Sequence, residues 1–133
     1  MKNLKTVHFF IIIVLAFMSQ TCSKDSSDSS EDLTKTIIGN YKCMLTTGTT
    51  ITATDIPTVI TRENNNTIKI AITGRETVFA TVSKFNTYFL INVKDQTGIT
   101  EGSGGDFGSN EINFGFKKTG TTEKLNYYGT KSL

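Results

Sequence analysis

Apolar and polar side chains alternate with a period of two over most of this chain, from about residue 36 to its end. The pattern is clearest at residues 67–73, where isoleucines occupy every second position, and at residues 111–116, where Ile112, Phe114 and Phe116 do so. Successive side chains of a β-strand point to opposite faces, so both segments are typical of half-buried antiparallel strands. Turn residues recur about every eight to twelve positions, and no stretch has a helical period. The pattern predicts an all-β domain.

We expect eight short strands, at residues 37–45, 49–54, 56–63, 67–73, 77–82, 87–93, 111–116 and 124–131. Eight antiparallel strands can close into a small barrel, which removes the exposed edges of a flat sheet. A two-sheet β-sandwich is the alternative. A barrel of this size is filled by side chains or holds one small ligand. Because the chain has enough Ile, Val, Phe and Tyr to fill it, we expect no large preformed cavity.

Turn lengths predict which side chains face inward, because a hairpin sets the residues that lie opposite each other. A two-residue turn in the asparagine run at 64–65 places Ile70 opposite Val59. A four-residue turn after residue 82 places Val78 opposite Ile91, so both strands send apolar side chains inward.

The turn at Gly74 decides the orientation of the following strand. A three-residue turn aligns Ile72 with Val78 and leaves Phe79 outside, whereas a two-residue turn would bring Phe79 inside. We choose the three-residue turn. On the resulting outer face, Phe79 should lie opposite Leu90 and near Tyr88, with Tyr128 on the last strand.

The N-terminus has the features of an export signal. Lys2 and Lys5 precede ten uncharged residues, 9–18, whereas a membrane-spanning helix needs about 20 apolar residues. Cys22 follows, and then a Ser- and Asp-rich stretch. A signal peptide ending at Cys before such a tether resembles the lipoproteins of Bacteroidota, in which that Cys is diacylated through its sulfur after cleavage. The usual pattern has a Leu-like residue three positions before Cys and a small residue just before it, where this chain has Ser19 and Thr21.

The predicted organisation is therefore a lipoprotein signal peptide at 1–21, a lipidated Cys22 with a disordered polar tether at 22–35, and a β-barrel domain at 36–133. Lipidation would place the protein in the cell envelope, at the outer membrane, on its periplasmic or its surface-exposed side. The alternative is ordinary cleavage nearby, which leaves a soluble exported protein with Cys22 free.

Charge and composition exclude several classes of function. Of 14 Lys and Arg, two lie in the signal, which leaves 12 against 12 Asp and Glu, so nothing suggests nucleic acid as a partner. The only histidine, His8, also leaves with the signal, which removes His-based catalysis and His metal sites. We therefore expect that the protein is not an enzyme and binds no metal and no cofactor.

Cys43 should be a small core residue, facing inward with Tyr41 and Leu45.

Residues 94–110 form the one irregular region, with Asp95, Glu101 and Asp106 among five glycines. The carboxylate spacing matches no EF-hand loop. The stretch Gly102–Gly105 lacks the Lys and the following helix of a phosphate loop. It is more typical of a flexible turn or a small glycine-rich strand.

Three short motifs carry a second resemblance: Gly39-Asn40-Tyr41, Gly102-Ser103-Gly104 and the closing segment 126–131. They are similar to those of the small lipocalin-like, or calycin-like, β-barrel lipoproteins of Bacteroidota. Lipocalins open with Gly-x-Trp, but this chain has Tyr41 there and no Trp. The resemblance therefore implies the barrel more strongly than any ligand.

Two functions remain open. The first is a non-enzymatic binding module for a small hydrophobic or glycan ligand, bound at the barrel mouth or on an aromatic patch formed by Phe79, Tyr88, Leu90 and Tyr128. The second is a structural or interaction lipoprotein, with a filled barrel, that docks on another envelope protein.

Overall fold

The computed structural model describes residues 31–133, and every regular element in this part is a β-strand. The predicted signal peptide, Cys22 and most of the predicted tether lie outside the described residues. The strands are β1 (Gly39–Thr47), β2 (Thr50–Asn64), β3 (Thr67–Ile72), β4 (Thr77–Phe85), β5 (Tyr88–Val93), β6 (Ile99–Gly108), β7 (Glu111–Lys118) and β8 (Lys124–Lys131). Within residues 31–133, no helical segment has the length and hydropathy of a membrane span.

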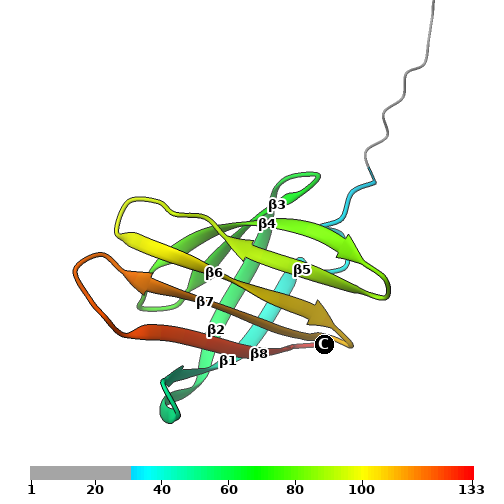
Figure 1. The fold of residues 1–133 in the computed structure, drawn as a ribbon. Helices are drawn as coiled ribbons and strands as arrows, with labels where there is room; N and C mark the ends of the chain where they lie inside the picture. Colours follow the sequence, from blue (N-terminus) through cyan, green and yellow to red (C-terminus); the bar gives the residue numbers. More distant parts are fainter. Residues whose placement is uncertain (1–30) are drawn as a thin grey trace, which may run out of the picture. The chain divides into compact units, whose positions relative to one another are not determined.

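The eight strands form a closed antiparallel barrel in which sequence neighbours pair and β8 closes onto β1 (Figure 1). This confirms the predicted barrel, and the two-sheet sandwich is wrong. Closure gives every strand two hydrogen-bonded neighbours, so the sheet has no free edge. The chain runs up and down, so the β2–β3, β4–β5 and β6–β7 turns lie at one end and the other turns at the opposite end.

The strands do not all follow the predicted boundaries. The segments predicted as separate strands at 49–54 and 56–63 form the single strand β2. Asp55 lies within it with a φ of 53°, next to a register shift against β1. Because Asp tolerates this left-handed conformation, the chain forms a bulge there instead of a turn. The eighth strand is β6, which occupies most of the region predicted to be irregular.

The register of the β2–β3 hairpin corrects the prediction by one residue. Ile70 lies opposite Ile60, not Val59. A shift of one residue exchanges the two faces of a strand, and Ile60 is accordingly 1% exposed whereas Val59 is 42% exposed. The two-residue turn lies at Asn65–Asn66, one position later than predicted, and the register shift between Arg62 and Asn64 reduces the resulting displacement to one residue.

The other two predicted hairpins have the right faces but the wrong partners. Val82, not Val78, lies opposite Ile91, because β4 and β5 are joined by a short turn with Asn86 at a φ of 54°. Val78 lies opposite Ile70 instead of Ile72. Both errors span an even number of residues, so the inward faces are preserved and Val78 and Ile91 are buried.

Aromatic side chains occupy much of the barrel interior. Tyr127 is fully buried, and its ring stacks on those of Phe114 and Phe116 at centroid distances of 5.1 and 5.7 Å. Tyr41 meets the edge of Phe107 at 6.5 Å. Ile, Val and Leu side chains from all eight strands complete the core. Burial at roughly 25 cal/mol per Å² of apolar surface makes this interior the main source of stability.

The structured part begins earlier than the predicted boundary at residue 36. Thr34 and Ile37 are both fully buried, and the Tyr41 hydroxyl donates a hydrogen bond of 2.5 Å to the Ile37 carbonyl. The Leu33 amide donates to the Asn65 carbonyl in the β2–β3 turn at 3.0 Å. Residues 33–37 therefore pack at the end of the barrel that carries this turn. Apolar Leu33 and Ile37 explain why these residues join the core, although they follow a polar stretch.

Two acidic residues attach this segment to the neighbouring strands. Asp32 accepts hydrogen bonds from the Thr34 hydroxyl (2.7 Å) and amide (3.1 Å), and it pairs with Arg62 at 3.3 Å. The Thr34 hydrogen bond is the main cause that lowers the pKa of Asp32. Glu31 pairs with Lys84 at the end of β4 at 3.0 Å. The chain thus enters the domain beside the β4–β5 turn.

Candidate functional site

A groove of about 830 Å³ lies on the outer face of the barrel, across β1, β8, β7 and the end of β6. Its position follows from the alternation along these strands: Tyr128 and Asn113 line it, whereas the adjacent Tyr127 and Phe114 point into the core. The lining residues are Lys42, Cys43, Met44, Thr54, Asp55, Tyr88, Asp106, Gly108, Ser109, Glu111, Ile112, Asn113, Tyr128, Gly129 and Thr130.

Two tyrosines supply the aromatic surface of the groove. Tyr128 is 48% exposed and lies opposite Met44 on β1 and Asn113 on β7. Tyr88 comes from the start of β5, where its ring packs on Phe85 at a centroid distance of 5.3 Å. The groove therefore offers one well-exposed aromatic ring flanked by a thioether and an amide, with a second ring contributed by a neighbouring strand.

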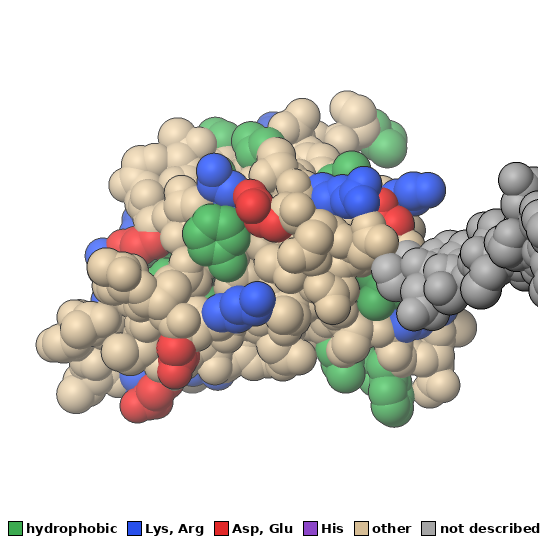
Figure 2. Space-filling view, turned by 90° about the horizontal axis from the view of Figure 1, so that it is seen from above, with side chains coloured by type: hydrophobic (Ala, Val, Ile, Leu, Met, Phe, Trp, Pro, Cys, Tyr) green, Lys and Arg blue, Asp and Glu red, His purple; other side chains and the backbone are tan. Residues whose placement is uncertain are grey.

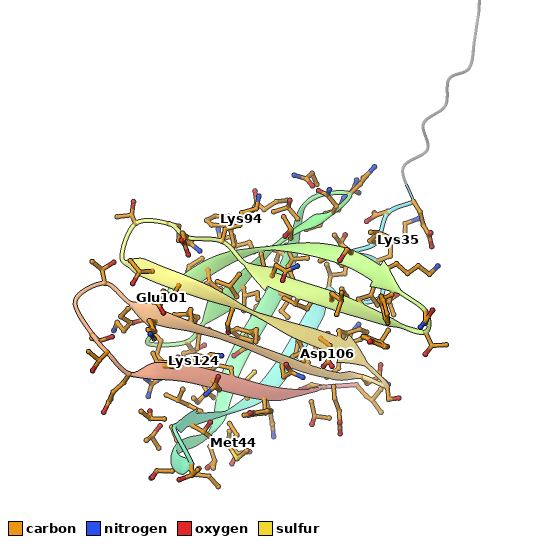
Figure 3. The ribbon with its side chains drawn as sticks, viewed as in Figure 1. Lys35, Met44, Lys94, Glu101, Asp106 and Lys124 are labelled. Atoms are coloured by element: carbon orange, nitrogen blue, oxygen red, sulfur yellow. The ribbon has the colours of Figure 1, made fainter. Side chains whose placement is uncertain are left out.

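Asp106 and Asn113 form a hydrogen-bonded pair between β6 and β7. The Asn113 side-chain amide donates to the Asp106 carboxylate, and the Asp106 backbone amide donates to the Asn113 side-chain oxygen at 3.2 Å. Figure 3 shows Asp106 near the end of β6 that leads into β7. Two mutual hydrogen bonds hold both side chains in fixed positions beside the groove.

The charged side chains that line the groove are Asp55, Asp106, Glu111 and Lys42, so three carboxylates face one ammonium group. Such a lining disfavours anionic ligands. Carboxylates, amides and the hydroxyls of Thr54, Ser109 and Thr130 are all hydrogen-bond acceptors, and several also donate. Among residues 31–133, no three His, Cys, Asp or Glu side chains come close enough to hold a metal ion.

The structure separates the four aromatic and apolar residues that the sequence placed in one patch. Tyr88 and Tyr128 both line the groove, but Phe79 and Leu90 do not. Leu90 lies opposite Ser83, four residues further along β4 than Phe79, and Phe79 lies opposite Lys69. The predicted Phe79–Leu90 pair is therefore wrong, because the β4–β5 turn is shorter than assumed.

Several lining residues were absent from the sequence-based prediction. Met44 and Asn113 stand at outward positions of predicted strands, and Asp55 lies between two strands that the sequence predicts as separate. Only the closed topology brings them together, since β1 and β8 are far apart in the sequence but are neighbours in the barrel. Alternation along β7 and β8 could have marked Asn113 and Tyr128 as outward neighbours, given the pairing of these strands.

The three carboxylates of the glycine-rich region have separate partners: Asp95 precedes β6, whereas Glu101 and Asp106 lie within it. Glu101 pairs with Lys117 at 2.5 Å, and Asp95 accepts the Gly102 amide at 2.9 Å. Figure 3 shows Glu101 and Asp106 towards opposite ends of the strand. Asp95 and Glu101 thus make ordinary surface contacts, and of the three carboxylates only Asp106 lines the groove.

Cys43 is 1% exposed, together with its equally buried neighbours Tyr41 and Leu45, so the predicted inward orientation is confirmed. Burial raises the pKa of the Cys43 thiol, against a smaller opposing effect of Thr58. A buried thiol with a raised pKa is a poor nucleophile. Cys43 contributes to the groove lining only from its buried position on β1.

A second polar cluster lies at the end of the barrel away from the chain entry. Glu76 pairs with Lys118. Burial alone would raise the pKa of Glu76, but the hydrogen bond from Lys118 and the nearby positive charges lower it overall. Burial and the Glu76 carboxylate raise the pKa of Tyr127 to about 12, against the opposing effect of Arg75. Among the described residues, Glu76 Oε2, Ser103 Oγ and the Tyr127 hydroxyl are buried without a hydrogen-bond partner.

The remaining surface carries no large patch of one charge sign on the face seen in Figure 2. Basic and acidic side chains are interspersed there, and hydrophobic side chains appear as separate spots. The groove with its two tyrosines is thus the candidate binding site.

Comparison with known proteins finds a solved structure with a similar fold. No protein-family model matches this chain, and no curated protein matches it. Among solved structures, it is similar to a protein of Bacteroides fragilis that is provisionally named an outer membrane protein, with a crystal structure at 2.40 Å resolution. The TM-score is 0.51 at 18% identity, and the match covers 76% of this chain. This chain spans about half of the other, 53%. At this identity the likeness concerns the fold.

Proposed function

We propose that this chain is a lipid-anchored, lipocalin-like protein of the cell envelope that binds a neutral glycan, without catalysis, in the outer groove. The observation that carries the proposal is the position of Tyr128 in that groove, exposed and flanked by Met44 and Asn113. Aromatic rings stack on the apolar faces of sugars, and fixed amides and carboxylates bind sugar hydroxyls.

The dimensions and charge of the groove support this ligand class. Its volume of about 830 Å³ lies within the usual range of ligand sites, about 300–1,000 Å³. Three carboxylates against one ammonium group favour an uncharged ligand over an anionic one. The stacked rings of Phe114, Phe116 and Tyr127 occupy the space in which a lipocalin-like barrel would hold a hydrophobic ligand.

The placement in the envelope rests on the sequence. The N-terminal signal, Cys22 and the polar tether support export and acylation. The similarity to a Bacteroides protein provisionally named an outer membrane protein agrees with this placement. Replacing Cys22 with Ala should move the protein from the membrane to the soluble fraction, and unchanged membrane partition would contradict the anchor.

Glycan binding is tested by screening the purified protein against neutral oligosaccharides and measuring the affinity of any hit by calorimetry. Tyr128→Ala should weaken binding about two- to tenfold, because an aromatic contact contributes about 0.5–1.5 kcal/mol. Val59→Ala is the matched control, since Val59 is 42% exposed on β2 and lies outside the groove. Equal affinities for Tyr128→Ala and Val59→Ala would contradict the groove as the site.

Docking on another envelope protein is the second candidate. Ile51 and Val59, 57% and 42% exposed on β2, support it as apolar side chains outside the groove. Cross-linking in cells distinguishes the two functions. Docking through β2 predicts that Val59→Ala reduces capture of a partner, whereas glycan binding predicts that only Tyr128→Ala changes the ligand complex.

A further inference from the structure

The tip of the β4–β5 hairpin exposes an aromatic pair next to the point where the chain enters the domain. Phe85 is 50% exposed, and its ring lies 5.3 Å from that of Tyr88 across the short turn. Lys84, the preceding residue, pairs with Glu31 at 3.0 Å. The aromatic tip and the first described residue of the chain are therefore neighbours. We propose that this tip contacts the phospholipid bilayer, an inference that rests on the proposed lipid anchor at Cys22.

The length of the chain before the domain supports this occupant. Nine peptide units separate Cys22 from Glu31, which span at most about 30 Å when straight. A nine-residue strand such as β4, at about 3.3 Å per residue and a tilt of about 40°, gives a barrel height of about 23 Å. If the opposite end faced the bilayer, these residues would have to run almost straight along the whole barrel. The entry end can face the bilayer without that constraint.

The chemistry of the tip suits the membrane interface. An exposed Phe beside a Tyr presents an apolar body with one polar hydroxyl, a combination that lies favourably between headgroups and acyl chains. Arg62, Lys84 and Lys35 are exposed near this end and can contact phosphate groups, while Glu31 and Asp32 offset part of their charge. The contact thus depends on the aromatic side chains and on the anchor, with little dependence on anionic lipids.

The chain has no Trp, so a single Trp becomes a clean reporter of lipid contact. The test uses the full acylated protein in vesicles of zwitterionic phospholipid, with and without bromine atoms on the acyl chains, which quench Trp emission. We expect Phe85→Trp to show a blue-shifted emission and at least about twofold quenching. Ile51→Trp is the matched control, because Ile51 is 57% exposed beside the β1–β2 turn at the opposite end. It should show neither effect.

Flotation of the same samples with the vesicles tests the lipid anchor separately from the bilayer contact of the hairpin tip. Co-flotation without quenching of Phe85→Trp overturns the bilayer contact and leaves the anchor intact. Equal quenching of both variants overturns the proposed orientation. Failure to float overturns the anchor and the bilayer contact together, whereas the glycan affinity measured in solution is independent of all three results.

Discussion

Tyr127 and Tyr128 are adjacent in the sequence and of the same residue type, yet they belong to different regions of the molecule. Tyr127 is 0% exposed and stacks on Phe114 and Phe116 inside the barrel. Tyr128 is 48% exposed and lines the outer groove between Met44 and Asn113.

The comparison shows how a single strand can serve two purposes. Because successive side chains point to opposite faces, β8 contributes Tyr127 to the core and Tyr128 to the candidate site. Changes on one face should therefore leave the other largely unaffected, and the following predictions test this separation, from the largest expected effect to the smallest.

Tyr127→Ala should lower the free energy of unfolding by about 3–5 kcal/mol, because it removes a large buried ring and leaves a cavity. Urea unfolding followed by circular dichroism measures the change. Tyr127→Phe is the control and should stay within about 0.5 kcal/mol of the wild type, since the hydroxyl has no hydrogen-bond partner among the described residues. A loss below about 1 kcal/mol for Tyr127→Ala would show that Tyr127 does not differ from Tyr128 in its contribution to stability.

Gly105→Ala should destabilise the protein by about 1–3 kcal/mol, because an added Cβ would lie 2.0 Å from the backbone oxygen of Asn113 and the strands must separate. Gly104→Ala is the matched control, since its nearest neighbour would be the Asn92 side-chain oxygen at 3.3 Å. Thermal unfolding of both variants checks the prediction. Equal melting temperatures would show that β6 tolerates a side chain at either position.

Alkaline pH should destabilise the barrel through its buried tyrosines. Burial raises the pKa of Tyr127 to about 12 and also raises that of Tyr41, whereas both have the ordinary value near 10 when unfolded. Folding stability from these groups is therefore complete below about pH 10 and decreases as pH rises toward 12. Urea unfolding across this window should show a smaller loss for Tyr127→Phe. An identical pH dependence in that variant would contradict the assignment.

Tyr128→Ala should change the free energy of unfolding by no more than about 0.5 kcal/mol, since the side chain is half exposed and outside the core. The same urea measurement applies, alongside the binding assay for the groove. A stability loss close to that of Tyr127→Ala would show that the two faces of β8 are coupled and that both tyrosines belong to one packing unit.

Most inward-facing positions could be predicted from the sequence. The predicted inward positions of Cys43, Val78 and Ile91 are buried, and Phe79 remains outside. These positions follow from alternation, which survives an even error in turn length. Ile60 and Val59 were exchanged because the β2–β3 hairpin differs by one residue, and the extra residue in its register shift has no local signal.

The glycine-rich strand β6 could not be predicted from the alternation of its own side chains. Gly102 and Gly105 would each bring a Cβ within 2.0 Å of a neighbouring backbone oxygen, which explains glycine in a strand where alternation is absent. That constraint comes from β5 and β7, not from β6 itself. The prediction of a largely irregular 94–110 region was therefore based on composition alone.

The sequence by itself determined that the domain is all-β and which face of most strands is apolar, because side-chain alternation is a local property of each segment. Only the tertiary structure decided the pairings, the continuity of β2 across Asp55 and the assembly of the groove. Barrel closure sets β1 beside β8, and bulges shift the register between paired strands. Both are interactions between segments distant in sequence, so no local pattern records them.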